Sequence, residues 1–144
     1  MISDRDRYGG PDVKRGDPKK TRTKKETHRE ALNFAVSMFS LYIRKRDKRC
    51  VTCGSTDRLQ CSHVERSVRQ ATRFMEGNAF AQCARCHVFH HNQSETPLRD
   101  YQLQKIGPTG VQMMYSLSRT ICKRTASELW EIGAKYRNMA EEME

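Results

Sequence analysis

The sequence predicts a small α+β domain that is stabilised by a structural metal and flanked by helices. Two CxxC pairs lie in the middle of the chain, and amphipathic patterns with a helical period lie on both sides of them. Only 36% of the 144 residues are hydrophobic, so the chain has little apolar material with which to build a core. A bound metal would supply folding free energy that such a core lacks.

Four of the six cysteines form the pairs Cys50–Cys53 and Cys83–Cys86. Each pair has the spacing of a zinc knuckle, which presents two thiolates to one tetrahedral ion. Gly54 directly follows the first pair and suits the tight turn of a knuckle. The N-terminus lacks the apolar segment of a secretion signal, so disulfides are less favoured. The sequence therefore predicts structural Zn²⁺ bound by the four cysteines, with redox or unrelated cysteines as the alternative.

The chain begins with a basic segment and a predicted helix. Residues 1–26 contain many Lys and Arg and almost no apolar residues, which predicts a disordered basic arm or, alternatively, a solubilising tail. Residues 27–46 form the predicted N-terminal helix, in which Thr27 and Glu30 make a capping box. The apolar stripe of this helix consists of Leu32, Ala35, Val36, Phe39, Tyr42 and Ile43.

The zinc-stabilised core is predicted to span residues 47–95. Within it, residues 59–64 alternate between apolar and polar side chains, as one strand of a hairpin does. Residues 65–77 are basic and irregular, which predicts a loop. Residues 78–91 contain the second cysteine pair and are predicted to continue into a helix.

Residues 96–144 are predicted to form a helical extension. Thr96 and Pro97 begin a first helix, and Gly107 and Pro108 end it. The markers of two further helices are the apolar stripe of Val111, Met114 and Leu117 and the capping box of Thr125 and Glu128.

Three residues stand in a characteristic order around the cysteine pairs. His63 lies in the predicted strand, Asn78 follows the loop, and His87 comes directly after the last cysteine of the second pair. This arrangement resembles the HNH motif of the His-Me finger (ββα-metal) nuclease superfamily, in the subclass whose two CxxC pairs flank the motif. The resemblance covers residues 50–91 and implies a ββα-metal core, in which a hairpin is followed by a helix that begins near His87.

The resemblance implies a role for each of these residues in the hydrolysis of a phosphodiester bond. Such hydrolysis needs a base that activates water and a cation that stabilises charge on the phosphate and the leaving oxygen. A neutral imidazole can take a proton near neutral pH, and the resemblance gives this role to His63. It gives Asn78 the role of orienting the base and its loop, and it makes His87 a ligand of the catalytic metal, Mg²⁺ or Mn²⁺.

A second metal ligand is expected on the same helix face as His87. His91 follows it by four residues, so the two imidazoles can bind one ion, although His90 and His91 can equally be surface histidines. Many family members have Asp before the first His, where this chain has Ser62, a weaker ligand. Further candidate ligands are water, Glu65 and Cys61, the last of which can equally be a buried structural thiol.

A longer resemblance, over residues 49–137, is to the phage NinG (Rap) recombination endonuclease family. It is carried by the second cysteine pair and by the runs SHVERS (62–67), RF (73–74), DYQLQKIG (100–107) and TASELWEIGAKYR (125–137). Members of that family also lack the Asp before the His, and the resemblance implies a metal-dependent endonuclease that acts on branched DNA such as recombination junctions. Two alternatives stay open. One is a non-catalytic zinc-ribbon module that binds DNA or protein, and the other is an HNH nuclease used in nicking, genome packaging or homing.

The charge of the chain predicts DNA as the partner. Lys and Arg outnumber Asp and Glu by 27 to 17, which gives a formal net charge of +10. No base-reading motif is present, so contacts to the DNA backbone and shape are expected. No apolar run is long enough for a membrane helix, so we expect a cytoplasmic protein (in the host, if a phage encodes it), with a homodimer as a further partner by analogy with junction enzymes. The predicted DNA-contacting residues, for which a solvated basic face is the alternative, are Arg44, Lys45, Arg46, Lys48, Arg49, Arg66, Arg69, Arg73 and Arg85.

Overall fold

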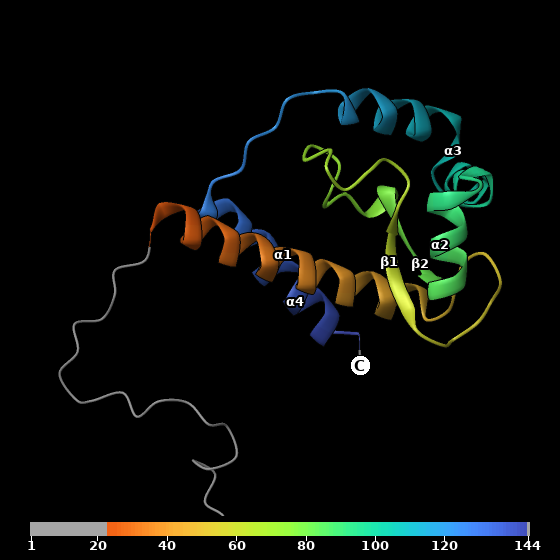
Figure 1. Ribbon diagram of the computed structural model, residues 1–144, viewed down its shortest axis with the longest axis horizontal. Coiled ribbons are helices and arrows are strands. Elements are labelled where there is room, and N and C mark those ends of the chain that lie inside the picture. Colours follow the sequence, from red (N-terminus) through yellow and green to blue (C-terminus); the bar gives the residue numbers. More distant parts are fainter. Residues whose placement is uncertain (1–22, 144) are drawn as a thin grey trace, which may run out of the picture.

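The computed structural model describes residues 23–143, and its elements confirm the predicted α+β class (Figure 1). The basic arm is predicted over residues 1–26. Residues 1–22 of it lie outside the described residues, and residues 23–26 lie at the start of α1. The elements are α1 (Lys24–Asp47), β1 (Leu59–His63), the 3-10 turn η1 (Glu76–Asn78), β2 (Ala79–Cys83), α2 (Ala84–Asn92), α3 (Thr96–Ser118) and α4 (Ala126–Glu141). None of these helices is long and apolar enough to cross a membrane.

Helix α1 begins one turn earlier than the sequence predicts. Thr23, not Thr27, is the N-cap: its hydroxyl accepts from the backbone N–H of Glu26, and the Glu26 carboxylate accepts from the backbone N–H of Thr23. The predicted capping box of Thr27 and Glu30 is therefore wrong. Both pairs have the required spacing, and the earlier one caps a helix that is longer by one turn.

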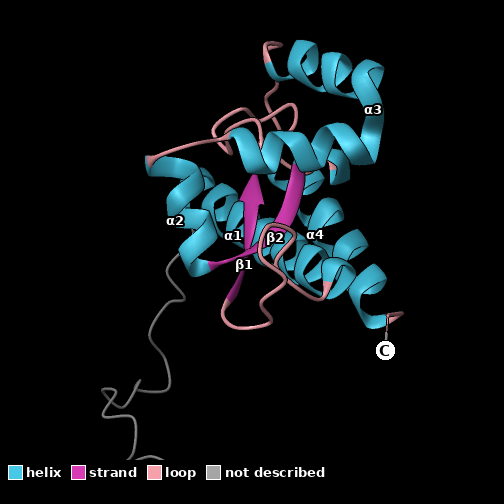
Figure 2. Cartoon of the chain, turned by 90° about the vertical axis from the view of Figure 1, so that its right-hand side faces the viewer, coloured by secondary structure: helices cyan, strands magenta, loops and turns pink. Residues whose placement is uncertain are grey.

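Strands β1 and β2 form an antiparallel hairpin in which His63 pairs with Ala79 and Leu59 with Cys83. Alternate residues of β2 point to opposite faces of the hairpin. Ala79 and Ala81 pack in the cluster formed by α1 and α4, whereas Phe80 packs with Leu98 of α3. Figures 1 and 2 show the hairpin between α1 on one side and α2 and α3 on the other. The loop after β1 is irregular, as predicted, and ends in η1.

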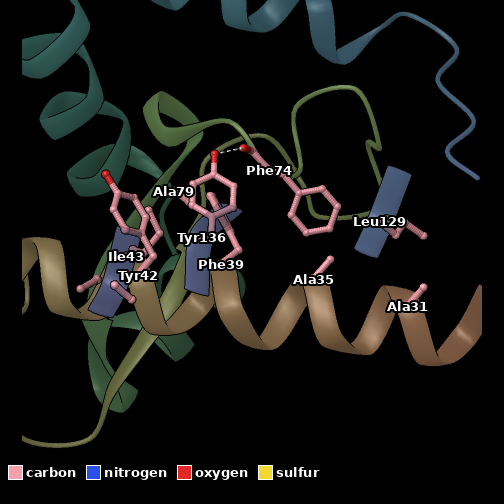
Figure 3. Close-up of a cluster of buried hydrophobic side chains, with 11 residues drawn as sticks. Ala31, Ala35, Phe39, Tyr42, Ile43, Phe74, Ala79, Leu129 and Tyr136 are labelled. Atoms are coloured by element: carbon pink, nitrogen blue, oxygen red, sulfur yellow. Dashed lines mark hydrogen bonds between the residues drawn. The ribbon is translucent and has the colours of Figure 1, made fainter. Parts of the chain in front are cut away.

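The main core lies between α1, α4 and the hairpin. Phe39 of α1 is its centre: the ring lies edge-on to the rings of Tyr136 and Phe74, with centroids 4.8 and 5.7 Å away (Figure 3). The Tyr136 hydroxyl donates to the backbone carbonyl of Phe74 at 2.8 Å. This contact fixes the loop that follows β1 against α4, so the C-terminal helix helps to position the loop.

Helix α3 bends sharply in the middle. Gly107 has φ 72° and ψ 172°, a conformation that only glycine adopts readily, and Pro108 follows it. The predicted break at Gly107–Pro108 is thereby confirmed, with helical structure on both sides of it. The predicted capping box of the last helix is also confirmed, since Thr125 and Glu128 exchange the two expected bonds.

Candidate histidine and metal site

The four cysteines predicted to bind zinc lie together. Their sulfur atoms are all within 4.8 Å of one another, which confirms a cluster that could hold a structural metal such as zinc. Each pair forms a tight turn: the backbone N–H of Cys53 donates to Cys50 Sγ and that of Cys86 to Cys83 Sγ, both at 3.5 Å. Gly54 after the first turn has φ 79°, as the sequence predicts for a knuckle. Burial raises the pKa of Cys50, but backbone N–H donors outweigh it and lower the pKa to about 6, which favours the thiolate.

The cluster joins the end of α1 to the hairpin. The first pair follows α1, and the second pair lies where β2 ends and α2 begins, with Cys83 as the N-cap of α2. Between them, the backbone N–H of Val51 donates to the carbonyl of Ala81 at 2.9 Å. A metal held here would therefore fix the start of α2, the helix that carries His87 and His91.

A cavity of about 420 Å³ lies between α1, β1, the loop after β1 and α2. Three of the predicted site histidines line it: His63, His87 and His91. Arg66 and Arg73 line it from the loop. Its apolar wall includes Val36 and Phe39, which the sequence predicts only as part of the helix stripe, together with Val68 and Phe74. The cavity thus combines imidazole, guanidinium and apolar groups on one surface.

The ring of His63 is held in one tautomer. Its Nε2 lies 2.8 Å from the backbone carbonyl oxygen of Arg73, which can only accept, so Nε2 carries the proton. In the neutral ring Nδ1 then keeps the lone pair. Burial lowers the pKa of His63, and the nearby charges of Arg73 and His91 act in the same direction, although the bond to the Arg73 carbonyl opposes them. His63 is therefore a neutral imidazole, with a free acceptor nitrogen, at neutral pH.

Asn78 is fully buried behind the loop that carries Arg66 and Arg73. Its Oδ1 accepts from the backbone N–H of Glu65 at 2.7 Å, and its Nδ2 donates to the carbonyls of Glu65 and Thr72 at 3.0 and 3.1 Å. The side chain thus closes the loop by replacing backbone pairing that the loop lacks. This contact fits the loop-orienting role that the HNH resemblance implies for Asn78.

His87 and His91 lie one helical turn apart on α2 with their Nε2 atoms 2.9 Å apart. Two nitrogen ligands at right angles on one ion, with bonds near 2.1 Å, lie about 3 Å apart, so the pair fits a divalent cation. His87 Nδ1 lies 2.7 Å from Oε1 of Gln60, a residue on β1 that the sequence analysis missed, because its contact spans 27 positions and leaves no local signal. Burial and the neighbouring imidazoles lower the pKa of His87 to about 4, so its ring is neutral.

Of the other candidate ligands, Ser62, Glu65 and His90 do not line the cavity. Ser62 is fully buried and, by strand alternation, points to the opposite face from His63. Glu65 is buried and forms an ion pair with Arg99 at 3.3 Å. His90 is buried and bonds through Nε2 to the carbonyl of His63. Cys61, by contrast, lines the cavity, where burial raises the pKa of its thiol to about 12 and keeps it protonated.

The predicted DNA-contacting residues divide into four groups. Arg66 and Arg73 line the cavity, whereas Arg69, Arg85, Lys48 and Arg49 are exposed elsewhere on the described surface. Two residues of α1 are bound to backbone: Arg44 Nε donates to the carbonyl of Ser40 and Lys45 Nζ to that of Ala140. The prediction that Arg46 contacts DNA does not fit its position in the fold. Its guanidinium donates to Asp47 and to the carbonyls of Glu76 and Ala79. These bonds use its donors inside the fold, so Arg46 is a structural residue.

The hairpin, the helix that follows it and the cysteine cluster together define a small α+β protein with a site for a structural metal. Over residues 11–144 the sequence matches the family described as Bacteriophage Lambda NinG protein, and the chain belongs to this family. The predicted resemblance to NinG is thereby confirmed. No curated protein and no solved structure matches the chain.

Proposed function

We propose that this protein is a metal-dependent DNA endonuclease of the HNH type that acts on branched, recombination-related DNA. The observation that carries the proposal is the single cavity shared by His63, His87 and His91, in which one imidazole has a free acceptor nitrogen and two others face each other. The hairpin, η1 and α2 correspond to the ββα order that the HNH resemblance implies. The chain's NinG membership supports branched DNA as the substrate.

His63 is the general base of the proposed reaction. Its Nε2–H is bound to the Arg73 carbonyl, so Nδ1 is the nitrogen that takes a proton from the attacking water. The oxygen of that water bonds to phosphorus, and the bond from phosphorus to the leaving oxygen breaks. Because burial keeps the imidazole neutral at neutral pH, no proton has to be lost from His63 before the attack.

His87 and His91 are the residues that would hold the catalytic cation. Their facing Nε2 atoms offer two of its ligands, and the remaining positions would be open to water and phosphate oxygens. When bound, a divalent cation such as Mg²⁺ or Mn²⁺ stabilises negative charge on the phosphate and on the leaving oxygen. Ser62 is not among the proposed ligands, since it is buried on the other face of β1.

Arg66 and Arg73 would bind the DNA backbone beside the base. Both belong to the loop closed by Asn78 and line the cavity with His63. Guanidinium groups pair with phosphate oxygens through two parallel bonds, which fixes the position of the phosphate as well as attracting it. The four-cysteine cluster has a structural part in this proposal, because it fixes the first turn of α2.

The experiment is a cleavage assay on supercoiled plasmid, linear duplex and four-way junction DNA with Mg²⁺ or Mn²⁺. Wild type is compared with His87→Ala and with His28→Ala, a matched control whose exposed ring lies on α1 outside the cavity. We expect cleavage by wild type and His28→Ala, strongest on the junction, and its loss in His87→Ala. Tight DNA binding without cleavage under every metal would contradict the proposal and favour a zinc-binding module that only holds DNA.

A further inference from the structure

Gln60 connects strand β1 to the histidine pair on α2. Its side-chain Oε1 lies 2.7 Å from Nδ1 of His87, the shortest contact that either imidazole of the pair makes. Gln60 is exposed, so this bond is not needed to satisfy a buried group. A short bond at a solvent-accessible position, made to a residue of the candidate metal pair, calls for a functional reason.

The bond determines which nitrogen of His87 faces His91. An amide oxygen only accepts, so Nδ1 of His87 must carry the proton and Nε2 must keep the lone pair. That lone pair is on the side of His91, whose Nε2 is 2.9 Å away. If the amide were turned over, its NH₂ group would donate to Nδ1, the proton would lie on Nε2, and His87 could not bind a metal through Nε2.

We propose that Gln60 is a positioning residue that prepares His87 to bind a divalent cation together with His91. Its carbonyl oxygen fixes the rotation and the tautomer of the His87 ring before the cation arrives. Histidine ligands commonly donate their second ring N–H to such an oxygen, which raises the basicity of the ligating nitrogen. The inference rests on the proposed function only in taking His87 and His91 as the cation-binding pair.

The first test measures the tautomer directly by long-range ¹H–¹⁵N NMR on the zinc-loaded protein without added divalent cation. We expect the ring nitrogens of His87 to show a protonated Nδ1 and an unprotonated Nε2 in wild type. In Gln60→Leu the signature should shift to a mixture of the two tautomers, because the acceptor is gone. A protonated Nε2 in wild type, or an unchanged signature in Gln60→Leu, would overturn the inference.

The second test measures the affinity of the zinc-loaded protein for Mn²⁺ by titration calorimetry. Gln60→Leu should bind Mn²⁺ about 10- to 100-fold more weakly than wild type, the usual loss when such a supporting partner is removed. Gln60→Glu should retain wild-type affinity or exceed it, because a carboxylate accepts the same bond more strongly. The matched control is Gln104→Leu, since Gln104 is exposed on α3 and does not line the cavity.

No detectable binding of Mn²⁺ by wild type would overturn the inference. An affinity in Gln60→Leu within twofold of wild type, an equal loss in Gln60→Glu, or an equal loss in Gln104→Leu would overturn the inference. The titration is independent of catalysis, so a protein that binds Mn²⁺ through this site but cleaves no DNA would leave the inference standing and remove the proposed function. If Gln60→Leu cleaves DNA as fast as wild type and binds Mn²⁺ with the same affinity, the inference is wrong and the proposed function stands.

Discussion

The side-chain amide of Asn78 binds both backbone polar groups of Glu65. Its Oδ1 accepts from the N–H at 2.7 Å, and its Nδ2 donates to the carbonyl at 3.0 Å. The two residues are 13 positions apart, and the chain between them is thereby closed into a loop, which supplies both Arg66 and the Arg73 carbonyl that holds His63. The tautomer of the proposed base thus depends on a buried amide that does not line the cavity.

Replacing Asn78 should disorder this loop. Asn78→Ala leaves the backbone groups of Glu65 and Thr72 buried without partners, at about 1–3 kcal/mol for each lost bond. We expect a fall in the free energy of unfolding of several kcal/mol and a large loss of cleavage, measured by chemical denaturation and by the plasmid assay. The matched control is Asn33→Ala on the exposed face of α1, which should change neither quantity. Equal behaviour of the two variants would contradict this reading of Asn78.

Zinc should be stoichiometric and required for the fold. Elemental analysis of the purified protein is expected to give one Zn²⁺ per chain, and Cys53→Ser should lose it, because a hydroxyl does not replace a thiolate ligand. The melting temperature of Cys53→Ser should fall by at least about 10 °C, which corresponds to a few kcal/mol for a chain of this size. Cys122→Ser is the control, since Cys122 lies outside the cluster. Zinc retained at full occupancy in Cys53→Ser would contradict the four-cysteine site.

The pH dependence of cleavage should report the protonation of His63. Burial lowers its pKa below the usual value of about 6.5, and only the neutral ring can accept a proton. The single-turnover rate should therefore keep more than half of its plateau value at pH 6.5 and fall further as the pH drops through the lowered pKa. Binding of DNA and zinc content, measured at each pH, should stay constant over this range. A rate that already halves above pH 6.5, or that never falls on acidification while zinc stays bound, would contradict His63 as the base.

Two arginines predicted to bind DNA should respond differently to mutation. Arg66→Ala should weaken DNA binding and reduce the steepness of its salt dependence by about one unit, because one phosphate contact is lost, with little change in stability. Arg46→Ala should instead lower the free energy of unfolding by about 2–3 kcal/mol, because the carbonyls of Glu76 and Ala79 each lose a bond and the Asp47 carboxylate keeps only the backbone N–H of Ala81 as a donor. Filter binding at several salt concentrations and chemical denaturation separate the two effects. Equal effects of both variants on binding and stability would refute this assignment.

The local elements of the fold were predictable from the sequence because their signals are local. Each of these signals depends on residues within a few positions of one another. They are the two CxxC pairs, the strand that ends at His63, the break at Gly107 and the capping box of Thr125. The start of α1 was misplaced for the same reason. Two consecutive Thr-x-x-Glu sequences, at residues 23–26 and 27–30, satisfy the capping pattern, and the local sequence does not choose between them.

Contacts between distant segments were not predictable. The bond from Gln60 to His87 and the cavity wall supplied by Phe39 depend on how α1 and α2 pack on β1, which no spacing in the sequence encodes. The placement of Arg46 inside the fold depends on carbonyls 30 and 33 positions away. Ser62 was considered as a ligand from its place beside His63, yet adjacent residues of a strand point to opposite faces.

The most direct measurement of the central claim is the single-turnover cleavage rate of a four-way junction, with Mn²⁺, by wild type and His63→Ala. The account predicts that His63→Ala cleaves at least about 100-fold more slowly, the usual cost of removing a general base. It also predicts an unchanged dissociation constant for the junction and an unchanged zinc content. Equal rates for the two proteins, or no cleavage by wild type on any DNA tested, would contradict the assignment of this cavity as a nuclease active site.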